Sequence, residues 1–121
     1  MRICIPTLES NGTDARMSDH FGRAPYFTVY DTENRQVSTI NNQNSEHAHG
    51  TCMPVDKLKE KKIDAVLCKG MGLRAVNMLL SAGIKPLLVE ANTVADAITK
   101  HENGDVRIID ANLSCQHHEC H

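Results

Sequence analysis

The densest group of residues that could bind a metal lies in the last seven positions of the sequence. Cys115, His117, His118, Cys120 and His121 are interleaved there with Gln116 and a carboxylate, Glu119. Thiolate and imidazole together suit zinc, copper or iron. The spacing differs from that of a zinc finger, whose ligand pairs come from two separated segments. We therefore predict a metal-binding tail; a disordered tract that binds metal without a specific role is the alternative.

A second group of ligand types is formed by His47, His49 and Cys52. These residues lead into a segment with helical periodicity, and a helix N-terminus lowers the pKa of a nearby thiol. Imidazole and thiolate commonly share soft metals, which favours a ligand role. A solvated polar loop is the alternative reading of the same residues.

Two further segments carry groups that suit an anion. Gly70, Met71 and Gly72 follow an apolar run and precede a helical pattern, and glycines let backbone amides approach a ligand closely. His20 and Arg23 lie in a glycine-containing loop, where an imidazole and a guanidinium could bind an anion. Short glycine-containing segments are often only turns, so Gly70, Met71 and Gly72 alone are weak evidence for a binding site.

The remaining cysteines and the strand-end aspartates are weaker evidence for a functional site. Cys4 and Cys68 lie inside apolar runs, and we predict that both are buried thiols. The cysteine count of five is odd and no secretory signal is present, so a disulfide framework is not expected. Asp31, Asp64 and Asp110 could gather as a metal-dependent hydrolase site, although aspartates at strand ends usually close turns.

Composition limits the class of protein. The 121 residues fit one compact domain, and with 40% hydrophobic but only 3% aromatic residues the core must be aliphatic. A formal charge of −2 argues against sequence-independent binding to nucleic acid. No apolar run approaches the roughly 20 residues that span a bilayer. We expect a cytoplasmic protein without nucleic-acid or membrane partners.

The elements that must position these residues follow from hydrophobic periodicity. Apolar and β-branched runs predict strands at Arg2–Pro6, Tyr26–Asp31, Gln36–Asn42, Ile63–Cys68 and Ile84–Glu90, and a short strand or extended segment at Val106–Ile109. Helical spacing predicts helices at about Thr51–Lys62, at Leu73–Ala82, and from a Thr93 cap to Gly104, with Asp96 completing a capping box. A long loop is expected between the first two strands.

This order predicts an α/β fold. The first three strands are joined too closely for helical crossovers and should be antiparallel, whereas the later strands alternate with helices and should be parallel. The result is a mixed sheet flanked by helices. Such sheets bind ligands at the carboxyl ends of their parallel strands, beside helix N-termini. The patterning divides the chain into a domain at 1–112 and a tail at 113–121.

The segments His20–Phe27, Lys69–Ala75 and Ala82–Ile84 also carry a resemblance. The sequence resembles the dinitrogenase iron–molybdenum cofactor biosynthesis proteins, small carriers of metal–sulfur clusters, over about residues 1–110. The resemblance implies a ribonuclease H-like mixed sheet without nuclease activity. By position it implies that an anionic cluster is bound by His20, Arg23, the His47–Cys52 loop, and the turn of Gly70, Met71 and Gly72. This chain has Cys52 near a position where many relatives have glycines, and the tail lies outside the resemblance.

Three hypotheses follow. The leading one is a non-enzymatic carrier of an iron–sulfur or molybdenum-containing cluster, whose partners are metallocofactor assembly or acceptor proteins. The alternative is a metal-responsive interaction module that binds zinc or copper through its tail. A hydrolase using the strand-end aspartates is the weakest.

Overall fold

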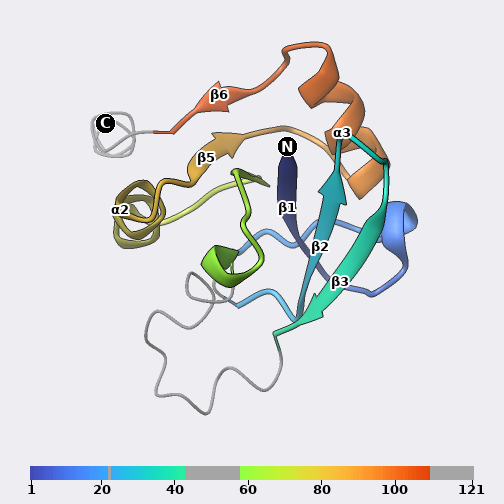
Figure 1. The fold of residues 1–121 in the computed structure, drawn as a ribbon, viewed down its shortest axis with the longest axis horizontal. Coiled ribbons are helices and arrows are strands. Elements are labelled where there is room, and N and C mark those ends of the chain that lie inside the picture. Colours follow the sequence, from blue (N-terminus) through green and yellow to red (C-terminus); the bar gives the residue numbers. More distant parts are fainter. Residues whose placement is uncertain (22, 43–57, 110–121) are drawn as a thin grey trace.

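The structure, a computed structural model, describes residues 1–21, 23–42 and 58–109 (Figure 1). Its centre is a six-stranded sheet in the order β3-β2-β1-β4-β5-β6. The strands are β1 (Arg2–Thr7), β2 (Tyr26–Asp31), β3 (Val37–Asn41), β4 (Ala65–Cys68), β5 (Lys85–Leu88) and β6 (Arg107–Ile108). The helices of the described residues include the 3₁₀ helix η1 (Gly12–Asp14), α2 (Leu73–Ser81) and α3 (Val94–Glu102), and residues 58–60 are also helical.

The predicted mixture of strand directions is confirmed. β1 pairs antiparallel with β2, and β2 pairs antiparallel with β3. β1 pairs parallel with β4, and β4 pairs parallel with β5, to which the chain crosses through α2. β6 returns antiparallel to β5, so the segment around residue 107 is a strand.

Side-chain alternation gives the sheet two buried faces. Cys4, Val66 and Cys68 point to one face, where they join Val76 and Leu79 of α2 in a core cluster. The intervening strand residues point to the other face and join α3 through an equally aliphatic cluster that contains Ile3, Ile5, Ala65, Leu67, Val94 and Ala97. Because both faces are covered, the central strands are apolar on both sides. Figure 1 shows α2 and α3 on opposite sides of the sheet.

Helix ends follow from local chemistry. The Thr93 hydroxyl accepts a hydrogen bond from the Asp96 amide at 3.3 Å, which confirms the predicted cap of α3. The reciprocal bond expected of a capping box differs, because the Asp96 carboxylate accepts from the Asn92 amide. Gly83 and Gly104, which follow α2 and α3, have φ values of +79° and +82°, a conformation that favours glycine.

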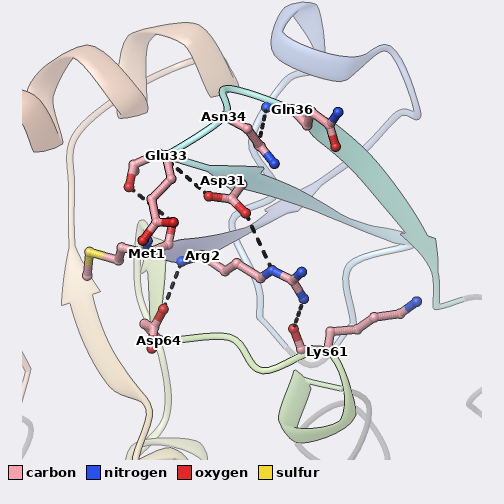
Figure 2. Close-up of polar contacts among 9 residues, drawn as sticks. Met1, Arg2, Asp31, Glu33, Asn34, Gln36, Lys61 and Asp64 are labelled. Carbon is pink, nitrogen blue, oxygen red and sulfur yellow. Dashed lines mark hydrogen bonds and ion pairs between the residues drawn. The ribbon is translucent and has the colours of Figure 1, made fainter.

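The amino ends of β1 and β4 are joined by a polar network around Arg2 (Figure 2). The Arg2 amide donates to the Asp64 carboxylate at 2.8 Å, and the guanidinium donates to the Lys61 carbonyl at 2.6 Å. Arg2 Nε also lies 3.6 Å from Asp31 Oδ2. These contacts tie β1, β2 and the segment before β4 together at the amino edge.

Element boundaries differ from the predictions by one or two residues at most sites. The strand expected to reach Glu90 ends at Leu88, and the loop after β1 contains η1. Most of the helix predicted at Thr51–Lys62 falls outside the described residues. No helix in the described part of the chain is long and apolar enough to span a membrane.

Candidate functional site: a polar pocket at the carboxyl edge of the sheet

A pocket of about 320 Å³ opens where the loop after β1 meets the loop after β4. Eight of the residues that the structure describes line it: Asp19, His20, Phe21, Arg23, Gly70, Met71, Gly72 and Ala75. Five of the residues proposed from sequence as anion-binding groups therefore lie around one cavity. Its volume is near the lower end of the range for small-molecule sites, which suits a compact ligand.

The loop that carries His20 is fixed by Ser18. The Ser18 amide donates to the Pro6 carbonyl of β1 at 2.8 Å, which joins the loop to the sheet. The buried Ser18 hydroxyl donates to the His20 carbonyl and accepts from the His20 amide, at 3.0 and 3.1 Å. The backbone of His20 is thereby held at the pocket while its side chain is exposed.

The far side of the same loop is anchored by aromatic packing. Phe21 is buried with its ring centroid 5.4 Å from that of Phe27 on β2. Ala24 is also buried, and its carbonyl accepts a hydrogen bond from the Asn42 side-chain amide at 2.8 Å. The exposed Arg23 lies between these two anchors, so its position at the pocket rim follows from core packing.

The opposite wall of the pocket is the start of α2. Gly72 is the N-cap residue, and no side chain caps the helix there. The first amides of a helix lack intrahelical partners and carry partial positive charge. A Cβ placed on Gly70 or Gly72 would meet no atom within 4 Å, so both glycines border open space. This wall can offer backbone donors to an anion.

Charges around the pocket favour a negative ligand. Among the described residues of the lining, Asp19 is the one acidic residue, and its carboxylate lies 3.5 Å from Lys69 Nζ. Arg23 forms no ion pair with any residue in the described ranges. With Asp19 offset by Lys69, the pocket retains the charge of Arg23 and the positive end of α2.

Cys4 and Cys68 are buried, as predicted from their apolar surroundings. Burial raises the pKa of the Cys68 thiol to about 12, partly offset by a hydrogen bond with the Gly70 backbone. Burial also raises the pKa of Cys4, and the neighbouring Cys68 adds to that rise. Both are therefore neutral thiols near pH 7, unlike the thiolates that bind metals.

The other residues proposed from sequence lie elsewhere or outside the described residues. His47, His49 and Cys52 are outside them, as are the tail residues Cys115, His117, His118, Cys120 and His121. Among the residues that the structure does describe, no group of three or more His, Cys, Asp or Glu side chains could hold a metal ion. The roles of these residues stay predictions.

The strand-end aspartates do not lie at the pocket. Asp31 and Asp64 are at the amino edge, where both contact Arg2 (Figure 2), and Asp110 is not described. The pKa of Asp31 is lowered, first by a hydrogen bond from the Glu33 amide and then by the charges of the N-terminus and Arg2. These contacts account for the two carboxylates as structural groups.

Sequence reasoning missed four parts of the site. Asp19, Phe21 and Ala75 line the pocket, and Lys69 pairs with Asp19. Each is adjacent to, or one helical turn from, a residue that was proposed. That proximity was an available signal, but the pairing of Lys69 with Asp19 depends on how β1 and β4 lie side by side.

The fold and the pocket together define a class of protein: a small α/β domain with a polar pocket at the carboxyl edge of its parallel strands. Comparison with known families identifies it more closely. Residues 1–104 match the family described as dinitrogenase iron-molybdenum cofactor. The chain belongs to this family.

Solved structures give the same result. A candidate NifB protein from Thermotoga is 32% identical, with a TM-score of 0.77 over 88% of this chain and 91% of that one. The apo form of the orange protein from Desulfovibrio gigas is 25% identical, with a TM-score of 0.81 over 89% and 92% of the two chains. A search of curated proteins found no match.

Proposed function

We propose that this protein is a non-enzymatic carrier that binds an anionic metal–sulfur cluster, of the iron–sulfur or molybdenum-containing kind, during metallocofactor assembly. The observation that carries the proposal is the pocket shared by Arg23, His20 and the uncapped start of α2. Membership of this family supports a metal-containing cluster as the cargo, because the family is named for the dinitrogenase iron-molybdenum cofactor.

The chemistry of the pocket suits binding and release. Arg23 would supply a charge-assisted hydrogen bond, and the amides around Gly70–Gly72 would supply neutral donors. A cargo held by such contacts can leave without breaking a covalent bond. His20 would contact sulfide or metal at the rim, and we propose His47, His49 and Cys52 as further ligands. The partners would be proteins that load or accept the cluster.

Anaerobic reconstitution of the full chain with iron, sulfide and thiomolybdate tests the proposal. We expect a coloured protein that retains metal after desalting. Arg23→Gln should weaken retention about 10- to 100-fold, since hydrogen bonds to charged groups contribute about 1.5–3 kcal/mol. The matched control is Arg35→Gln, which makes the same change on an exposed residue before β3. A colourless product, or equal retention by both variants, would contradict the proposal.

A further inference from the structure

An ion pair at the polar pocket joins the two loops that form it. Lys69 Nζ lies 3.5 Å from Asp19 Oδ1. Asp19 belongs to the loop after β1 and lines the pocket, whereas Lys69 directly follows β4 and precedes Gly70, which also lines the pocket. Lys69 lines a neighbouring cavity of about 440 Å³ as well. Because each partner of the ion pair lines one of the two cavities, the ion pair lies at the boundary between them.

The two partners differ in how much of their side chains water reaches. The Asp19 side chain is 77% exposed, and the Lys69 side chain is 32% exposed. Asp19 lies between Ser18 and His20, and the Ser18 hydroxyl holds the His20 backbone, so the Asp19 backbone is fixed at the pocket while its carboxylate stays in water. Ion pairs with an exposed partner are weak, because water and salt screen them. The Lys69 ammonium group can therefore exchange Asp19 for a more highly charged anion.

The charge of Asp19 opposes an anionic ligand in the pocket. Among the described residues of the lining, Asp19 carries the one carboxylate and Arg23 the one permanent positive charge. Without a ligand, Lys69 and Asp19 together add no net charge. A multivalent anion attracts an ammonium group more strongly than a single carboxylate does at the same distance. Exchange of Lys69 from Asp19 to the ligand would thus place a second cation beside the ligand and leave Asp19 as a repelling charge.

We propose that Lys69 is a further cargo-binding residue and that Asp19 sets how tightly the cargo is held. When the anionic cluster binds, the ammonium group moves from Asp19 to the cluster, and when the cluster leaves, Asp19 pairs with the ammonium group again. Asp19 thereby lowers the affinity of the site, which favours release of the cargo to an acceptor. The inference rests on the proposed function and adds to it a residue pair that balances binding against release.

Binding of tetrathiomolybdate, a divalent anion with visible absorption, to the full chain without oxygen tests this inference. Lys69→Gln should weaken binding several-fold. Asp19→Asn should strengthen binding several-fold and slow the release of the bound anion. An ion pair that only held the two loops together would make both substitutions change the affinity in the same direction, since either one breaks the pair. Changes in the same direction, or an unchanged affinity in either variant, would overturn the inference.

The double variant Asp19→Asn/Lys69→Gln shows whether the two residues act together. In a chain that already carries Lys69→Gln, the substitution Asp19→Asn removes a repelling charge but frees no ammonium group. Its gain in affinity should therefore be smaller there than in the original chain. Equal gains in the two chains would show that Asp19 acts through its charge alone, and exchange of Lys69 would be wrong.

Two substitutions away from the pocket are matched controls. Asp105→Asn changes an exposed aspartate after α3, and Lys85→Gln changes an exposed lysine at the amino end of β5. Both variants should bind tetrathiomolybdate as the original chain does. A change in either control as large as that in Asp19→Asn or Lys69→Gln would show a general effect of charge and would overturn the inference.

Failure of the proposed function gives a different result from failure of this inference. If the proposed function is wrong, the original chain binds no tetrathiomolybdate, or Arg23→Gln binds it as well as the original chain does. If Arg23→Gln weakens binding while Asp19→Asn and Lys69→Gln leave it unchanged, the pocket binds the anion and only the role of the ion pair is wrong.

Discussion

Two positions at the end of β4 show how burial decides which groups a ligand could reach. Cys68 is fully buried, whereas Gly70, two residues later, borders the open pocket. The thiol is the stronger metal ligand by type, but desolvation keeps it protonated. Residue type alone would rank Cys68 above Gly70 as a binding residue. Position in the sheet reverses that order.

The buried thiols give a prediction at this scale. Cys4 and Cys68 should resist alkylation by iodoacetamide in the native protein at mildly alkaline pH and react only on unfolding, as measured by peptide mass spectrometry. Because burial raises the pKa of Cys68 from 9.0 to about 12, the folded state holds this proton more tightly than the unfolded chain. Its contribution to stability is complete below pH 9 and is lost as pH rises towards 12. Rapid labelling of Cys68 in folded protein would contradict this.

At the scale of elements, the start and the end of α2 use glycine for different reasons. Gly70 precedes the helix with an ordinary φ and no neighbour within 4 Å of a built Cβ. Gly83 follows the helix at φ +79°, where an L side chain is strained. The first glycine borders the open pocket that we propose as the cargo site, and the second ends the helix. This difference can be tested by one type of substitution.

Gly70→Ala should leave the free energy of unfolding within about 0.5 kcal/mol of the original, because the methyl group enters open space. It should reduce cluster retention if the cargo occupies that space, as we propose. Gly83→Ala should cost about 1 kcal/mol through strain at positive φ and leave retention unchanged. Denaturant unfolding and metal analysis after desalting measure the two effects. Equal retention by both variants would show that Gly70 does not border the cargo.

The strands and helices were largely predictable from sequence, because alternation at Ile3, Cys4 and Ile5 and helical spacing around Val76 and Leu79 follow directly from burial. The pocket was predictable in outline, since parallel strands bring their following loops to one edge. The pairing of Lys69 with Asp19 was not, because it joins residues fifty positions apart. The end of β5 at Leu88 also depends on a partner, the short strand β6.

On the scale of the whole molecule, the two edges of the sheet have separate roles. At the amino edge, Arg2 forms hydrogen bonds or an ion pair with Asp31, Asp64 and Lys61 (Figure 2). The carboxyl edge keeps Arg23 and the first amides of α2 free of such contacts within the described residues. Polar groups used for stability and polar groups available to a ligand thus lie at opposite ends of the same parallel strands.

Asp31→Asn tests this separation. It removes the charge that faces Arg2 and the N-terminus, so the melting temperature near neutral pH should fall by a few degrees, a modest effect typical of exposed ion pairs. Because the pKa of Asp31 is lowered, its stabilising contribution is present above pH 3.8 and is lost as pH falls through the folded-state value. The difference in melting temperature between Asp31→Asn and the original protein should therefore disappear in acid.

Cluster retention should not change in Asp31→Asn, in contrast to Arg23→Gln, which should lower retention with little effect on melting. If Asp31→Asn lowered retention as strongly as Arg23→Gln while the protein stayed folded, the two edges would not be functionally separate.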